Sequence, residues 1–242
     1  MSNQFIKYSI TLPCYNEEQN IPNIFKRFQD ALGVRRDIEV ILVNNGSTDN
    51  SGQVLAKEKE KPENYFSKIV SVTKNQGYGF GILSGLKESR GEFLGWTHAD
   101  LQTDPYDIVR AVDILENRDD VKTILLKGKR IKRNIFDELF TSGMSIISSF
   151  ALQSKLNDVN AQPKIFHRSF YKLIVENAPY DFSLDLYILY KANIMKLKIV
   201  ELPVAFDKRL YGESKGGGTL KGKIKLIRRT WAYIFELRRK LR

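Results

Sequence analysis

Hydrophobic and polar residues follow two alternating patterns over the first 127 positions of the chain. Short runs of apolar residues alternate with longer segments whose apolar residues recur every three or four positions, so the first pattern predicts strands and the second amphipathic helices. The predicted strands cover residues 8–12, 38–43, 68–72, 93–97 and 121–127. The predicted helices cover residues 21–32, 49–61, 79–89 and 107–116. This order predicts an α/β fold: a Rossmann-like, mostly parallel central sheet with helices on both faces.

The pattern becomes mainly helical after about residue 130. We expect a long helix, a short strand, a helix, a strand, a glycine-rich loop and a last helix. They cover residues 135–156, 164–166, 184–196, 199–204, 212–218 and 220–242 in that order. We expect one domain over residues 1–219, with halves at about 1–127 and 128–219, followed by a basic amphipathic C-terminal helix over 220–242.

The composition indicates a globular protein rather than a disordered or membrane-embedded one. Of the 242 residues, 42% are hydrophobic and 28% are charged. The single cysteine excludes a disulfide framework and a cysteine-based zinc site, and the two histidines exclude a His-rich metal site. This favours a reducing cytosolic compartment. No apolar stretch approaches the length of a membrane span, and the N-terminus lacks the order of a signal peptide. We therefore expect neither a spanning helix nor secretion.

The positive charge of the chain is concentrated at its end. The formal net charge is +11, but residues 208–242 hold twelve Lys and Arg against two acids, a net of +10. The remaining 27 basic and 26 acidic residues leave +1 on residues 1–207. A nucleic-acid binder spreads its charge over a reading surface, so this distribution favours an anionic membrane surface or another acidic partner.

Polar and glycine-rich segments follow the predicted parallel strands, where such sheets bind ligands. They cover residues 13–18, 44–49, 75–81 and 98–104. The glycines of the third segment lack the spacing of a dinucleotide fingerprint, and this segment follows the third strand rather than the first. These two departures argue against a Rossmann oxidoreductase.

Three of these segments carry a family resemblance. They read Pro13-Cys14-Tyr15-Asn16-Glu17-Glu18, Val43-Asn44-Asn45-Gly46-Ser47-Thr48-Asp49 and His98-Ala99-Asp100-Leu101-Gln102-Thr103-Asp104-Pro105. Together with Arg209 and Gly212-Glu213-Ser214-Lys215, they resemble the family 2 inverting glycosyltransferases of GT-A fold, and among these the polyprenyl-phosphate sugar transferases. The likeness spans residues 8 to 215. It implies a sugar donor linked to UDP or GDP, a divalent metal and a lipid-linked acceptor. The first candidate for this acceptor is polyprenyl phosphate.

The donor is expected at the first strand ends. A base edge and a ribose need several acceptors at short range, and Glu17, Asn45 and Asp49 lie on neighbouring loops. The resemblance implies a nucleotide-sugar site formed by Pro13, Tyr15, Glu17, Asn45, Asp49, Gly77, His98 and Asp100. The family usually has two aspartates at Asn44-Asn45, and an amide, which donates and accepts, suits uracil at least as well as guanine. The alternative is a plain turn and helix cap.

The resemblance implies a metal site at Asp100, Gln102 and His98. Asp100 matches the second acid of the Asp-x-Asp motif, and Gln102 stands where a glutamine joins it in the polyprenyl-phosphate enzymes. His98 replaces the first acid. Imidazole suits Mn²⁺ better than Mg²⁺, so Mn²⁺ is favoured unless His98 lies outside the coordination shell. His98 is alternatively a strand-end histidine bonded to a neighbouring loop.

The second half is expected to bind the acceptor. Asp158 matches an aspartate of the polyprenyl-phosphate enzymes, and Asp185 is a second acidic candidate. Either is the catalytic base if the acceptor is a sugar hydroxyl, whereas a polyprenyl phosphate is already anionic. The expected phosphate or acceptor ligands are Arg130, Lys164, Arg209, Ser214 and Lys215. The alternative for each is a surface salt bridge or helix cap.

The C-terminal segment predicts how the protein reaches its acceptor. Basic residues surround an apolar stripe that includes Trp231, as in interfacial membrane helices. The alternative is that this stripe packs on the domain or on a partner helix. We expect a metal-dependent glycosyltransferase at the cytoplasmic face of the membrane, with a membrane protein or a second copy as further partners. The other function classes left open are a non-catalytic nucleotide- or glycan-binding protein and a nucleic-acid binder.

Overall fold

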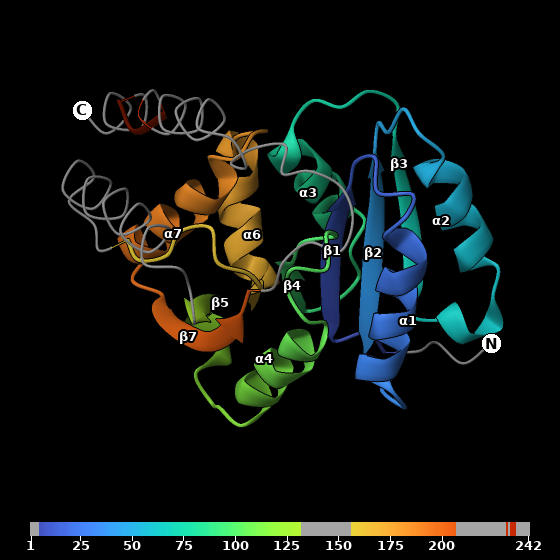
Figure 1. The fold of residues 1–242 in the computed structure, drawn as a ribbon. Helices are drawn as coiled ribbons and strands as arrows, with labels where there is room; N and C mark the ends of the chain where they lie inside the picture. The colour runs from blue at the N-terminus through green and yellow to red at the C-terminus, as the bar shows by residue number, and fades with distance from the viewer. Residues whose placement is uncertain (1–4, 132–155, 207–230, 232, 236–242) are drawn as a thin grey trace.

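The computed structural model describes residues 5–131, 156–206, 231 and 233–235. A seven-stranded sheet with the order β3-β2-β1-β4-β6-β5-β7 lies at its centre (Figure 1). The strands are β1 Tyr8–Cys14, β2 Ile38–Asn45, β3 Ser67–Val72, β4 Phe93–Trp96, β5 Ile124–Ile131, β6 Lys164–His167 and β7 Lys198–Ala205. All neighbouring pairs are parallel except those of β6, which runs antiparallel to β4 and β5.

The helices cover both faces of the sheet and bury a separate apolar core on each. The helices are α1 Ile21–Leu32, α2 Ser51–Lys59, α3 Tyr78–Lys87, α4 Tyr106–Glu116, α6 Arg168–Ile174 and α7 Leu184–Ile194. One core joins α1 and α4 to the sheet through residues such as Phe25, Phe28 and Ile108. The other joins α3, α6 and α7 through residues such as Ile82, Phe170 and Ile188. The predicted α/β architecture with two covered faces is confirmed.

Two predicted boundaries were wrong. The first strand continues through Pro13, where the pattern predicts its end, because β4 pairs with β1 only as far as Thr11. Proline has no backbone N–H to donate, and this is tolerated where the strand is no longer paired on both sides. The strand predicted over 121–127 begins with a short 3-10 helix, Val121–Thr123, and β5 then extends to Ile131.

The sequence did not predict α6 or the antiparallel direction of β6. Strand β6 enters between β4 and β5 from residues 156–163, and Gly128 permits its close approach. A Cβ on Gly128 would overlap the carbonyl group of Gln162, and the Gly128 N–H donates to the Pro163 carbonyl at 2.8 Å. The Gln162–Pro163 peptide bond is cis.

Some predicted elements lie outside the described residues. They are almost all of the helix over 135–156, the glycine-rich loop over 212–218 and most of the helix over 220–242. Ile234, one of the described residues of that last segment, is buried and belongs to the core of α3, α6 and α7. Among the helices that the structure describes, none has the length and apolar character needed to cross a bilayer.

Candidate active site

The loops after β1 and β2 are fastened to each other at the carboxyl edge of the sheet. The backbone N–H groups of Asn16 and Glu17 donate to the hydroxyls of Ser47 and Ser51 at 3.1 and 2.8 Å. In return, the Asn50 N–H donates to the Glu18 carboxylate at 3.0 Å. These reciprocal bonds hold the two loops expected to bind a nucleotide in one fixed arrangement.

Asp49 forms hydrogen bonds to both of these loops. Its Oδ1 accepts from the Ser51 N–H at 3.0 Å, and its Oδ2 accepts from the Glu18 N–H at 3.4 Å. Burial raises the pKa of Asp49, but the hydrogen bonds from Ser51 and Glu18 outweigh it and hold the pKa below its ordinary value. Glu17 lies alongside and accepts from the Asn20 amide at 2.5 Å. Both carboxylates therefore have partners inside the loop pair.

Asn45 connects the end of β2 to the turn that starts α3. Its Nδ2 donates to the Gly77 carbonyl at 3.0 Å, while its buried Oδ1 has no hydrogen-bond partner among the described residues. Gly77 has φ of 128°, and a Cβ there would overlap the carbonyl oxygen of Tyr180. The amide thus fixes a turn that only glycine fits, and it leaves one acceptor unsatisfied beside the expected nucleotide.

The loop between β4 and α4 brings His98, Asp100 and Gln102 together. The Asp100 Oδ1 accepts from the backbone N–H of Gln102 at 3.2 Å, and Leu101 between them has φ of 58°. Arg27 of α1 holds this loop, since it donates to the Leu101 carbonyl at 3.4 Å and contacts Asp104 at 3.2 Å. A left-handed leucine is a strained conformation, and such strain concentrates at functional sites.

The donor atoms of this loop fit a divalent cation. Asp100 brings a carboxylate, Gln102 an amide oxygen and His98 an imidazole, a mixed set that suits Mn²⁺. Burial lowers the pKa of His98, against the opposing effect of Asp100 and Asp185, which favours the neutral, metal-binding imidazole. Within the residues that the structure describes, no group of three or more His, Cys, Asp and Glu side chains is placed to hold a metal ion. The fit therefore requires further oxygen ligands, such as those of a diphosphate.

Asp185 is the centre of a buried polar cluster at the start of α7. Its Oδ1 lies 2.6 Å from the Lys164 ammonium, 2.9 Å from the Gln162 amide nitrogen and 3.3 Å from the Trp96 indole nitrogen. Its side chain is 3% exposed, and that of Lys164 is fully buried. Three donors thus converge on one oxygen of a carboxylate that has almost no contact with water.

Asp158 forms a second ion pair, with Arg130 at the end of β5. Its Oδ2 accepts from the Arg130 backbone N–H at 2.8 Å, and its Oδ1 accepts from the guanidinium Nε at 2.9 Å and from Nη2. Burial raises the pKa of Asp158, but the bonds from Arg130 outweigh it and lower the pKa below its ordinary value. Each predicted catalytic carboxylate is therefore paired with a predicted phosphate ligand.

A row of side chains, buried except for the partly exposed Glu201, crosses four strands, and sequence reasoning missed part of it. Trp96 of β4 is opposite Lys164 of β6, Lys164 is opposite Lys127 of β5, and Lys127 is opposite Glu201 of β7. Burial lowers the pKa of Lys127 to about 8. Alternate side chains along a strand share a face, so Lys127 lies on the same face as Leu125. This alternation is the signal that could have located Lys127.

An aromatic group lies between the two halves of the site. Tyr78 at the start of α3 stacks on Phe182 with ring centroids 4.8 Å apart, and the His98 ring lies 6.0 Å from Tyr78. The Tyr78 hydroxyl is 3.4 Å from the Gln162 amide nitrogen. These contacts link the loop after β4 to the Asp185 cluster, and no sequence pattern selects Tyr78 or Phe182 as site residues.

The expected site residues fall into three groups. The loops after β1 and β2 are hydrogen-bonded to each other and, through Asn45, to Gly77, and the loop after β4 lies at the same edge of the sheet. Asp158 pairs with Arg130 and Asp185 with Lys164, and His98 interacts electrostatically with Asp185, Lys164 and Arg130. Pro13 lies in the part of β1 that no longer pairs with β4, and Tyr15 follows the end of that strand; both are partly buried. Arg209, Ser214 and Lys215 lie outside the described residues.

Comparison with known proteins identifies relatives over most of the chain. Residues 9–172 match the family model described as glycosyl transferase family 2. An undecaprenyl-phosphate 4-deoxy-4-formamido-L-arabinose transferase of Photorhabdus laumondii is 30% identical over 88% of this chain and 63% of its own length. A dolichol-phosphate mannosyltransferase of Pyrococcus furiosus is 29% identical over 90% of this chain and 60% of its own length. The chain spans about three fifths of the length of these relatives.

Solved structures share the fold. A mannosyltransferase from Pyrobaculum calidifontis in complex with GDP-Man and Mn²⁺ superposes with a TM-score of 0.65 at 18% identity, over 89% of this chain and 59% of that one. A glucosyl-3-phosphoglycerate synthase from Mycobacterium tuberculosis with Mn²⁺, UDP-glucose and phosphoglyceric acid has a TM-score of 0.70 at 15% identity, over 96% and 79%. The expected GT-A fold is confirmed.

Proposed function

Because this chain belongs to glycosyl transferase family 2, we propose that it transfers a sugar, with inversion, from a nucleotide-sugar donor to a lipid-linked acceptor. The observation that carries the proposal is the arrangement of three strand-end loops at one edge of the sheet. The first two are fastened together through Asn16, Glu17 and Ser51, and the third presents His98, Asp100 and Gln102. Both similar structures described above contain a nucleotide sugar and Mn²⁺.

The donor half is assigned to residues 1–127. In this assignment Glu17 and Asn45 lie at the base and ribose, and the Asn45 amide also holds the Gly77 turn. Asp100, Gln102 and the neutral His98 would hold Mn²⁺ or Mg²⁺, with Mn²⁺ favoured by the imidazole. The bound metal would neutralise charge on the departing diphosphate. Gly77 allows the start of α3 to pack against the Tyr180 carbonyl, where a side chain would overlap.

Of two alternative acceptors, the one that we propose first is polyprenyl phosphate. Both relatives described above carry a polyprenyl phosphate in their names. Its phosphate oxygen is already anionic, so attack on the anomeric carbon needs no strong base. The Arg130 guanidinium, held in place by Asp158, is then the group that orients the acceptor.

A sugar hydroxyl of a lipid-linked glycan is the second acceptor, and one observation favours it. Arg130 and Lys164, the described residues expected to hold the acceptor phosphate, each already contact a carboxylate. Cations neutralised in this way attract a dianion less than free cations do. For a hydroxyl acceptor, Asp158 or Asp185 would accept the proton as the new bond forms.

The C-terminal segment is assigned to membrane attachment on the cytoplasmic side. Its net charge of +10 lies on residues 208–242, and basic residues near an anionic surface contribute about 1 kcal/mol each. Deleting residues 221–242 should weaken binding to anionic vesicles more than it weakens nucleotide binding. Equal loss of both would mean that this segment is needed for the fold rather than for attachment.

The proposed function is tested by a transfer assay with UDP- and GDP-linked sugars, Mn²⁺ and either undecaprenyl phosphate or extracted membrane glycolipids. We expect label to enter the lipid fraction with one donor. Label on undecaprenyl phosphate identifies the first acceptor, and label only on glycolipid identifies the second. Nucleotide binding without turnover of any donor would contradict the enzymatic proposal and favour a non-catalytic nucleotide-binding protein.

A further inference from the structure

The Asp185 carboxylate is held by side chains from outside its own helix. The Lys164 ammonium, the Gln162 amide and the Trp96 indole all donate to the same oxygen, Oδ1, at 2.6, 2.9 and 3.3 Å. Of the residues that the structure describes, none donates to the second oxygen, Oδ2. These bonds therefore fix one oxygen of the carboxylate and leave the other available.

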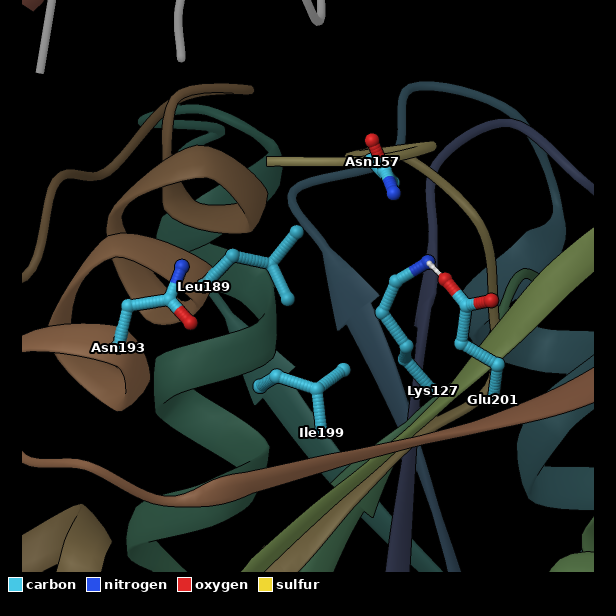
Figure 2. A pocket seen from close by; sticks show the side chains of 6 residues that line it. All are labelled: Lys127, Asn157, Leu189, Asn193, Ile199 and Glu201. Carbon is cyan, nitrogen blue, oxygen red and sulfur yellow. Dashed lines mark ion pairs between the residues drawn. The ribbon is translucent and has the colours of Figure 1, made fainter. Parts of the chain in front are cut away.

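The packing of α7 against the sheet is incomplete close to this carboxylate. A cavity of about 410 Å³ lies between α7 and the strands β5 and β7, and Leu189, one turn beyond Asp185, lines it. Figure 2 shows Leu189 of the helix and Ile199 and Lys127 of the sheet around this cavity. Because the helix meets a cavity there instead of a close-packed layer, the polar contacts of Asp185 have to set the position of its carboxylate.

Gln162 is the donor that connects Asp185 to another part of the site. Its Nε2 lies 2.9 Å from Asp185 Oδ1 and 3.4 Å from the Tyr78 hydroxyl. The nitrogen of this amide, and not its oxygen, faces Asp185, because a carboxylate repels an amide oxygen. Gln162 is buried, and its Oε1 has no hydrogen-bond partner within the described part of the chain. A buried acceptor without a partner costs stability, so stability alone does not explain an amide at this position.

Tyr78 extends these contacts to the loops expected to bind the donor. It directly follows Gly77, whose carbonyl accepts from the Asn45 amide at 3.0 Å. Its ring stacks on Phe182, three residues before Asp185, with ring centroids 4.8 Å apart. A continuous series of contacts thus runs from the end of β2 to the Asp185 carboxylate.

We propose that Gln162 and Tyr78 are positioning residues that act through Asp185. They hold its carboxylate in a fixed place relative to the donor loops, so that the oxygen without a donor is presented to the reacting groups. This inference rests on the proposed function, because it gives Asp185 a part in the transfer step.

The position of the carboxylate is tested first, in crystal structures of the full chain that need no turnover. Gln162→Met keeps the length of the side chain but removes its N–H donor, and it should displace the Asp185 carboxylate by more than about 0.5 Å. Gln29→Met is the matched control, because it removes a side-chain amide bond from α1 to Asn64. It should leave the carboxylate in place.

The second measurement is transfer kinetics with the donor and acceptor that the transfer assay identifies. Gln162→Met and Tyr78→Phe should each lower kcat at least about tenfold, because small displacements of a reacting group slow the reaction strongly. The KM for the donor should change less than about twofold, since the donor loops are intact. Asp185→Asn should also lower kcat, and adding Gln162→Met to it should cause no further loss, because the effect of Gln162 passes through Asp185.

Tyr187→Phe is the matched control for the loss of a tyrosine hydroxyl. This hydroxyl donates to the Ile174 carbonyl at 2.8 Å, so its removal should lower the melting temperature and leave kcat unchanged. The proposal is overturned if the carboxylate does not move in Gln162→Met, or if Gln162→Met lowers kcat no more than Tyr187→Phe does. It is also overturned if Gln162→Met lowers kcat equally with and without Asp185→Asn. A displaced carboxylate in a chain whose wild type transfers no sugar would instead contradict the proposed function.

Discussion

The Lys164 ammonium lies 2.6 Å from the Asp185 carboxylate, and both side chains are almost completely excluded from water. Lys164 begins β6, the strand that runs against its neighbours, and Asp185 lies in the first turn of α7. A carboxylate near a helix N-terminus also interacts favourably with the helix dipole. This pair therefore joins the antiparallel strand to the helix that carries the candidate catalytic carboxylate.

Removing the Asp185 charge should destabilise the protein strongly. Asp185→Asn retains an acceptor for Trp96 and Gln162 but leaves the buried Lys164 ammonium without its carboxylate. The expected loss in the free energy of unfolding is about 3 kcal/mol, measured by urea denaturation. Adding Lys164→Met to the same chain removes the unpaired charge and should recover most of this loss.

The matched control is the exposed ion pair of Lys26 and Asp30, with side chains 67% and 49% exposed. Asp30→Asn should cost less than about 1 kcal/mol, because water screens that pair. If Asp185→Asn costs no more than Asp30→Asn, the buried pair does not have the structural role described above.

Two adjacent asparagines should respond differently to the same substitution. Asn45→Asp replaces the amide that donates to the Gly77 carbonyl with an oxygen that repels it, and should cost about 1–3 kcal/mol of stability. Asn44→Asp keeps the oxygen that accepts from the Ser47 N–H, so it should be nearly neutral. Urea denaturation of the two variants tests this difference. Equal losses would show that the amide of Asn45 does not hold the Gly77 turn.

The lowered pKa of Lys127 predicts that the stability of the protein depends on pH. Burial lowers its pKa from 10.5 to about 8, so between these pH values the unfolded chain binds a proton that the folded protein has released. Stability therefore rises with pH across that window, by on the order of 3 kcal/mol at 1.36 kcal/mol per pH unit. Lys127→Met lacks this proton and leaves Glu201 paired with Lys129.

The measurement is the free energy of unfolding of wild type and Lys127→Met from neutral pH to about pH 10.5. The wild type should gain stability relative to the variant above pH 8. Curves that stay parallel over this range would mean that the pKa of Lys127 is not lowered in the folded protein.

The sequence pattern predicted the fold of the first 127 residues well, because strands such as β1 and β2 are continuous apolar runs and helices such as α1 bury one regular face. The helix over 21–32 illustrates this: its apolar residues at Ile21, Ile24, Phe25 and Phe28 are all buried in the observed α1. Likewise, the expectation that polar loops meet at the carboxyl edge follows from parallel strand direction alone.

The second half of the chain was harder to predict, because its contacts are set by a strand whose direction the sequence does not specify. Lys164 and Asp185 were each selected as candidates, but their pairing depends on β6 running antiparallel between β4 and β5. Lys127 and Glu201 were not selected, since a charged residue in a strand is usually solvated. Only the register across β6, β5 and β7 places them side by side in one row with Lys164.

The most direct test of a nucleotide-sugar site at the carboxyl edge is calorimetric titration of UDP and GDP into the full chain with Mn²⁺, for the wild type and Asp100→Asn. The variant retains an oxygen that can accept from the Gln102 N–H, so its loop geometry should be preserved. We predict Mn²⁺-dependent binding of one nucleotide, weakened in the variant at least about tenfold, or 1.4 kcal/mol, at an unchanged melting temperature. Absence of nucleotide binding to the wild type, or equal Mn²⁺-dependent affinity in the variant, would contradict the account.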